Sequence, residues 1–121
     1  VVILSPYTLD NSSMANSRKG HGLELSENLA DLDKNGIVYF STIRSFKGIE
    51  APAIILIDAD IPSDGERSAL RFEDLYVACT RPTARMAILS KNPEAIQWFN
   101  GRASRQGRLE AVECIATNRN L

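Results

Sequence analysis

The sequence predicts a three-layer α/β domain with a mostly parallel sheet, and three observations favour this fold class. The chain has 121 residues, 44% hydrophobic and 24% charged, which suits one globular domain with a single core. Four short apolar runs lie at residues 1–4, 37–43, 53–57 and 86–89. Most are nearly continuous in Val, Ile and Leu, as in strands buried on both faces of a parallel sheet. Segments with helical periodicity follow the later runs, and residues 1–121 show no repeat or domain boundary.

The first helix is expected over residues 66–80, between the third and fourth apolar runs. Apolar residues recur there at steps of three and four, which is the spacing of a helix with one buried face. They are Ala69, Phe72, Tyr76 and Cys79. We therefore expect these side chains to face the sheet.

A second helix is expected to begin at Pro93, because proline suits the first helical turn, and to end at Asn100 and Gly101. Residues 102–121 form either a last amphipathic helix or a ragged tail. The apolar residues that would line this terminal helix are Leu109, Val112 and Ile115.

The segment between the first two strands, residues 10–35, is rich in Ser, Asn, Asp and Gly. It predicts little regular structure apart from a short helix over residues 26–32. Ser26 is the expected N-cap of that helix, because a serine hydroxyl can accept from the first free backbone N–H groups.

The overall charge does not by itself indicate a partner. Fourteen Lys and Arg balance fifteen Asp and Glu, for a net charge of −1. Residues 81–108 differ from this average, with six cations against Glu94 alone, a local excess of +5. Such a cluster is equally typical of a solvated basic face and of a surface that contacts phosphates.

Several classes of site and location are excluded or disfavoured by residue counts. Cys79 and Cys114 do not form a CxxC pair, and His21 is the only histidine, so we expect no metal site and no Cys-His nucleophile pair. Two isolated cysteines favour a reducing, cytoplasmic setting with buried thiols, although a disulfide between them stays open. No apolar run approaches the roughly 20 residues that span a bilayer, so no membrane partner is expected.

The first chemically specific segment follows the second apolar run. Residues 42–50 read TIRSFKGIE, with a hydroxyl, two cations, a glycine and a carboxylate close together. Gly48 can turn the chain with a positive φ, and Lys47 can meet a phosphate. Glu50 can accept from a ribose hydroxyl.

The second segment, residues 75–81, reads LYVACTR and ends at Arg81. Because Arg81 directly follows an apolar helical face, its stem can pack while its guanidinium stays free to clamp a phosphate. The alternative is a surface arginine that pairs with Glu73 or Asp74.

Taken together and in this order, the two segments resemble motifs V and VI of superfamily 1 helicases of the UvrD/Rep type. The resemblance covers residues 38–89 and extends less securely to residues 1–7, where motif IV of the family would fall. It implies the second RecA-like motor domain, which closes over ATP that is bound mainly by the first.

The resemblance also implies roles for individual residues. Arg81 would be the arginine finger on the γ-phosphate, Glu50 would contact the ribose, and Gly48 would shape the loop between them. Thr42 and Arg44 would lie towards single-stranded nucleic acid. The remaining implied residues are Lys47, which could serve either ligand, and Tyr76, which would pack under the nucleotide cleft.

Three positions depart from the family pattern. Arg44 stands where the family often has His, which favours contact with a backbone phosphate over base readout. Pro82 stands where the family usually has Ala, and proline disfavours helical geometry at the preceding Arg81. Residues 5–7 lack the arginine that commonly makes a second phosphate contact there.

No GxxxxGK(S/T) phosphate loop occurs in the sequence. The resemblance therefore implies that ATP, with Mg²⁺, is bound in an intact protein that also has an N-terminal RecA-like domain, and that this chain alone binds none. Asp58 ends an apolar run like a Walker B aspartate, but without a phosphate loop upstream or a following Glu it is interpreted as a capping or solvated carboxylate. The chain is accordingly expected to be a piece of a larger protein.

These observations predict the C-terminal motor domain of an ATP-dependent helicase or translocase that acts on single-stranded DNA or RNA. The intact protein would be the ATP hydrolase, and this domain would supply the arginine finger. The alternative is a non-catalytic module, derived from such a domain, that docks nucleic acid or protein. A free-standing nucleotide-binding domain is a third hypothesis, and it would require measurable ATP affinity in this chain.

Overall fold

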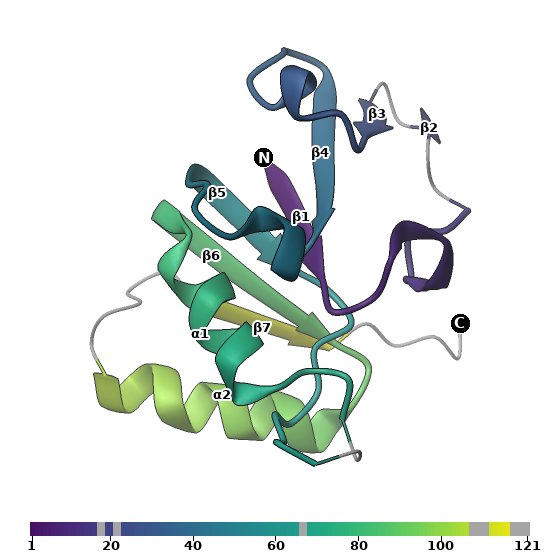
Figure 1. Ribbon diagram of the computed structural model, residues 1–121. Coiled ribbons are helices and arrows are strands. Elements are labelled where there is room, and N and C mark those ends of the chain that lie inside the picture. The colour runs from purple at the N-terminus through teal and green to yellow at the C-terminus, as the bar shows by residue number, and fades with distance from the viewer. Residues whose placement is uncertain (17–18, 21–22, 66–67, 107–111, 117–121) are drawn as a thin grey trace.

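The computed structural model describes the backbone of residues 1–16, 19–20, 23–65, 68–106 and 112–116, and the side chains of residues 1–16, 24–65 and 68–102. Within these ranges the chain forms a seven-stranded sheet in the order β2-β3-β4-β1-β5-β6-β7 (Figure 1). The strands are β1 (Val2–Ser5), β2 (Lys19–Gly20), β3 (Leu23–Ser26), β4 (Ile37–Thr42), β5 (Ala51–Leu56), β6 (Pro82–Ser90) and β7 (Val112–Ala116). β2 is antiparallel to β3, and every other neighbouring pair is parallel.

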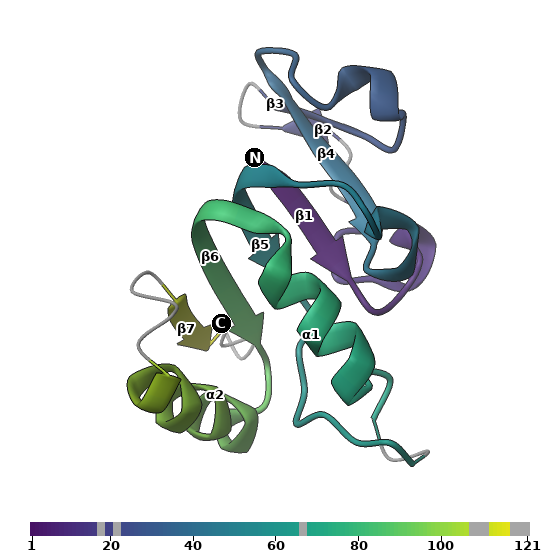
Figure 2. The same cartoon turned by 60° about the vertical axis from the view of Figure 1, so that its left-hand side comes forward.

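Helices and turns cover the sheet on both sides, so the predicted three-layer α/β fold with a mostly parallel sheet is confirmed. α1 (Phe72–Thr80) and α2 (Pro93–Gln106) lie side by side on one face (Figure 2). The other face is partly covered by the segment around the 3₁₀ turn η1 (Leu9–Asn11). Two further 3₁₀ turns, η2 (Leu29–Asp31) and η3 (Arg44–Phe46), flank β4. No helix in the described ranges is both long and apolar enough to cross a bilayer.

The larger part of the core lies between the sheet and the two α-helices. Alternate residues of the central strands point to this side, and they meet small or aromatic residues of the helices. The fully or almost fully buried members include Leu4, Ile54, Leu56, Phe46, Ala78 and Ala95. The four apolar runs of the sequence correspond to β1, β4, β5 and β6, as predicted.

The predicted buried stripe is correct at Cys79, which packs against the core, and wrong at Ala69, Phe72 and Tyr76, which are exposed. Phe72 and Tyr76 have relative exposures of 48% and 69%, whereas Asp74 and Ala78, which are four residues apart, face the core. Leu70, which precedes the helix, is buried and belongs to the core. Because Ala78 has a small side chain, this face of the helix can approach the sheet closely. Tyr76 lies on the exposed side of α1.

The C-terminal predictions also need correction. α2 does not end at Asn100 and Gly101 but continues to Gln106. Past the predicted end, the guanidinium of Arg102 lies over the ring of Trp98, 3.8 Å from its centroid, and such a contact offsets much of the cost of about 1 kcal/mol for a glycine inside a helix. Residues 112–116 form β7, parallel to β6, instead of a terminal helix. The open edge of β6 satisfies their backbone groups, while Leu109 lies outside the described residues.

The short helix predicted over residues 26–32 is replaced by the end of β3 and the turn η2. Asn28 is the N-cap, since its side chain accepts from the N–H of Ala30. Ser26 instead donates to Asp31 at 2.8 Å, and Lys34 pairs with the same carboxylate at 2.7 Å. The contacts with Lys34 and Ser26 lower the pKa of Asp31.

Truncation of Leu56 tests the position of the core. Leu56 is fully buried against the helices, so Leu56→Ala should lower the free energy of unfolding by about 2–5 kcal/mol. Ile55, which is half-buried on the opposite face, is the matched control, and Ile55→Ala should cost less than half as much. Urea unfolding followed by the fluorescence of Trp98, the single tryptophan, measures both. Equal losses would contradict the assignment of the main core to the helical side.

Candidate functional site

The structure divides the predicted site residues between the two edges of the sheet. Thr42 and Arg44 lie at the carboxyl end of β4, whereas Glu50 and Arg81 directly precede β5 and β6. Thr42 is level with Ser5, and the register of β1 with β5 places Ala51 six strand positions away. At about 3.3 Å per residue, the two groups are roughly 20 Å apart along the strands.

At the amino edge, Glu50 and Arg81 directly precede the first residues of the neighbouring strands β5 and β6. The N–H of Ala51 donates to the carbonyl of Arg81 at 3.1 Å, and Ala51 is in register with Pro82. Gly48 has a φ of +81°, so the predicted left-handed turn is confirmed. A Cβ at Gly48 would meet nothing within 4 Å, which means that backbone conformation, and not lack of space, requires glycine there. The side chain of Glu50 is exposed.

The guanidinium of Arg81 lies over the end of its own helix. Its Nε and Nη2 groups donate to the hydroxyl of Thr80 at 3.3 and 3.1 Å, and that hydroxyl donates to the carbonyl of Val77 at 2.9 Å. The alternative pairing of Arg81 with Glu73 or Asp74 is not formed. Arg81 is half-buried, and its remaining N–H donors have no partner within the ranges that the structure describes.

Pro82 does not disturb α1, because the helix ends at Thr80 and Pro82 is the first residue of β6. Arg81 nevertheless keeps helical angles, with φ −86° and ψ −32°, although a following proline disfavours them. Two backbone hydrogen bonds hold this conformation. The N–H of Arg81 donates to Ala78, and its carbonyl accepts from Ala51.

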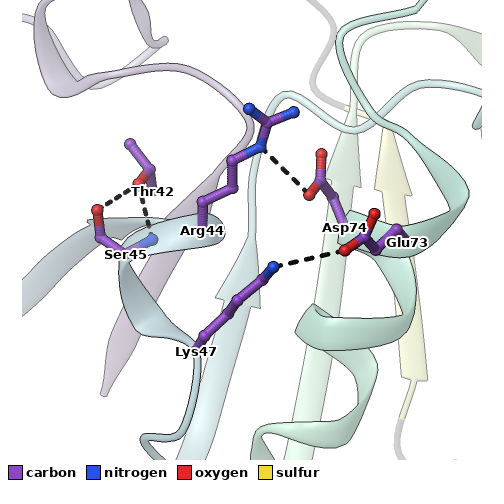
Figure 3. Close-up of polar contacts among 6 residues, drawn as sticks. All are labelled: Thr42, Arg44, Ser45, Lys47, Glu73 and Asp74. Atoms are coloured by element: carbon purple, nitrogen blue, oxygen red, sulfur yellow. Dashed lines mark hydrogen bonds and ion pairs between the residues drawn. The ribbon is translucent and has the colours of Figure 1, made fainter.

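At the other edge, two ion pairs join η3 and the residue after it to the first turn of α1 (Figure 3). Nε of Arg44 lies 3.5 Å from Oδ1 of Asp74, and Nζ of Lys47 lies 3.5 Å from Oε1 of Glu73. Carboxylates are favoured in a first helical turn by the helix dipole. Both cations that the sequence assigned to phosphates therefore face carboxylates in this structure.

Thr42 has a local role at the start of η3. Its hydroxyl donates to the Oγ of Ser45 at 2.9 Å and accepts from the N–H of Ser45 at 3.2 Å (Figure 3). These two contacts close the turn after β4, in which Arg44 lies.

A cavity of about 250 Å³ opens at the carboxyl ends of β1 and β4. Its lining residues are Pro6, Thr8, Thr42, Ile43, Arg44, Ala69 and Asp74. Thr8 lies outside both motifs, and the sequence predicted Asp74 only as an alternative partner of Arg81. Their position after β1 and in the first turn of α1 becomes informative once the strand order places β1 beside β4. Ligands in open α/β sheets bind at such carboxyl edges.

Asp58 joins two parts of the same edge. It has a φ of +56°, and its carboxylate accepts from the Oγ of Ser5 at 3.3 Å and from the N–H of Ser13 at 3.0 Å. The hydroxyl of Ser13 donates to it as well. Asp58 therefore holds the segment after η1 against the end of β5, a capping role rather than a solvated one.

Comparison of the chain with protein-family models, with curated proteins and with solved structures gives no match. No family is therefore shown for this chain.

The thiol of Cys79 gives a test of the packing behind Arg81. Cys79 is a free cysteine, and burial raises its pKa from 9.0 to about 11. The folded state disfavours the thiolate, so stability is unaffected below pH 9 and falls between pH 9 and pH 11. At pH 8, alkylation of Cys79 in a Cys114→Ser variant should be about 100-fold slower in the folded than in the urea-unfolded chain. Equal rates would contradict the buried position.

Proposed function

We propose that this chain is the second RecA-like motor domain of an ATP-dependent helicase or translocase of the superfamily 1 type, acting on single-stranded nucleic acid in the cytoplasm. One observation supports this proposal above the others. Glu50 and Arg81, the residues that end the two helicase-like motifs, directly precede the neighbouring strands β5 and β6 at one edge of the sheet. Two residues placed in this way can reach one nucleotide.

In this proposal ATP is the substrate, and its phosphates and Mg²⁺ are held mainly by an N-terminal RecA-like domain of the same protein. The chain has no phosphate loop of its own. Its contribution is an exposed carboxylate at Glu50, which can accept from a ribose hydroxyl, and a guanidinium at Arg81 that keeps N–H donors without a partner among the described residues. Gly48 turns the backbone so that Glu50 leaves the loop beside Arg81.

Arg81 would act when the two domains close. A guanidinium placed against the γ-phosphate lowers the barrier to hydrolysis when it interacts more strongly with the charge distribution of the transition state than with that of the bound substrate. If Arg81 and Glu50 contact ATP only in the closed state, ATP binding favours closure, and hydrolysis of ATP removes this preference for the closed state. This difference in affinity can drive movement along a strand.

The carboxyl edge would contact the strand. Arg44 is 68% exposed at its side chain, so it can exchange part of its interaction with Asp74 for a phosphate. Lys47 and Glu73 are both exposed, and such surface pairs contribute only about 0–1 kcal/mol. A phosphate backbone can therefore compete for these cations, and its binding should weaken with salt.

A specific observation also favours the second candidate, a non-catalytic docking module. Arg44 and Lys47 are already paired with carboxylates of α1, which reduces the positive charge available to nucleic acid. A docking module would bind a partner through the same surfaces without a contribution of Arg81 to ATP turnover. Measurements of turnover therefore distinguish the two functions.

Removal of the guanidinium tests the motor. In the protein that combines this chain with a phosphate loop, Arg81→Ala should lower kcat by about 10³-fold or more, with little change in nucleotide binding. Arg85→Ala removes an exposed arginine of β6 outside the proposed site and serves as the matched control, with kcat expected to stay at the wild-type value. An unchanged kcat in Arg81→Ala would exclude the arginine-finger role and favour the docking module.

Glu50→Gln tests the ribose contact separately. The amide keeps the size of the side chain but weakens acceptance from a hydroxyl, so KM for ATP should rise by about ten-fold while kcat changes less. The variant should unfold at the wild-type temperature, because Glu50 is exposed. A wild-type KM would argue against Glu50 as a nucleotide contact.

A further inference from the structure

The cavity at the carboxyl edge has a buried carboxylate in its wall. Asp74 is only 5% exposed and lies one helical turn before Ala78, a core residue. Its ion-pair partner, Nε of Arg44, is 3.5 Å away on a side chain that is itself 68% exposed. Burial of a charge with one weak partner costs stability, and an apolar residue often replaces such a group at no loss.

The other features of α1 do not account for this burial. A carboxylate in the first turn interacts favourably with the helix dipole, but Glu73 supplies the same interaction from an exposed position. Asp74 differs from Glu73 because it forms part of the cavity wall, together with Arg44 and Thr8. The difference between the two neighbouring carboxylates is therefore access to the cavity.

The polar groups of the cavity have defined hydrogen-bonding roles. An ionised Asp74 can only accept, and Arg44 can only donate. The hydroxyl oxygen of Thr8 accepts from Asn11 at 3.0 Å, which leaves its O–H available as a donor. The hydroxyl of Thr42 is engaged with Ser45. A complementary ligand therefore has an O–H or N–H for Asp74 and, within a few ångströms, an anion for Arg44 and Thr8.

A ribonucleotide unit has this arrangement, because its 2′-hydroxyl and 3′-phosphate are carried by neighbouring carbons of the sugar. We propose that this cavity holds the 2′-hydroxyl and the adjoining 3′-phosphate of a single-stranded RNA, with Asp74 as the acceptor that selects RNA over DNA. The inference rests on the proposed function, since it assumes that the carboxyl edge contacts a strand. The 2′-hydroxyl is the group that distinguishes the two nucleic acids at a given site.

The affinity of the 121-residue chain for fluorescent strands measures this selectivity. In fluorescence anisotropy at about 50 mM salt, oligouridine should bind about ten-fold more tightly than oligothymidine of equal length. A 2′-fluoro oligouridine, which keeps the sugar pucker but lacks the donor, should bind like the DNA. This arm needs no variant and so does not depend on how the protein tolerates substitution.

Two variants assign the selectivity to Asp74. Asp74→Asn should reduce the RNA-to-DNA affinity ratio to about one, with circular dichroism used to confirm that it is folded. Glu73→Gln is the matched control, because it removes the adjacent carboxylate outside the cavity wall, and its ratio should stay at the wild-type value. An unchanged ratio in folded Asp74→Asn would overturn the role of Asp74.

The remaining outcomes separate the two proposals. Equal binding of RNA and DNA, or tight binding of the 2′-fluoro strand, would overturn the 2′-hydroxyl site and leave the motor intact. Failure to bind either strand would contradict the nucleic-acid contact of the proposed function. If uridine 3′-monophosphate competes with an inhibition constant equal to the dissociation constant of the RNA strand, the assignment to a strand would be overturned. The ligand would then be a free nucleotide.

Discussion

The parallel pairing of β5 with β6 is the constraint on which the candidate site depends. The residues that directly precede the two strands are the chemically distinctive ones, Glu50 before β5 and Arg81 before β6, and a hydrogen bond joins the N–H of Ala51 to the carbonyl of Arg81. That bond holds Arg81 in a helical conformation despite the following Pro82, so α1 can end and the strand begin without an intervening turn. The position of Glu50 beside Arg81 then follows from the register alone.

α1 connects the two edges of the sheet. Its first turn carries Asp74, which faces the carboxyl-edge cavity, and its C-cap is Arg81 at the amino edge. Arg81 follows Asp74 by seven positions, a rise of about 10 Å at 1.5 Å per residue. The ion pair with Arg44 attaches the first turn to η3, and the bond from Ala51 attaches the end of the helix to β5. The same helix therefore has contacts at both edges of the sheet.

The fold was largely predictable from the sequence where structure is local. The four apolar strands and the turn at Gly48 agree with the patterns that indicated them. The predicted end of α2 at Asn100 and Gly101 was wrong, because the weak tendency of these two residues to end a helix is offset by contacts further along, such as that of Arg102 with Trp98. β7 was missed because a short mixed segment becomes a strand only when a neighbouring edge, here that of β6, accepts its backbone.

The buried strands and the two motifs that end in Glu50 and Arg81 can be identified from the amino-acid order, because apolar runs and motif spacing are properties of the chain alone. The folded arrangement was needed to show that these two residues precede neighbouring strands. It was also needed to show that Asp74 pairs with Arg44 and not with Arg81. The physical reason is that an amphipathic period defines a stripe but not which side of the helix turns towards the sheet. The side of α1 that faces the sheet is the one on which Leu70 and Ala78 pack into the core. This orientation determines which charged residues of α1 lie close to η3.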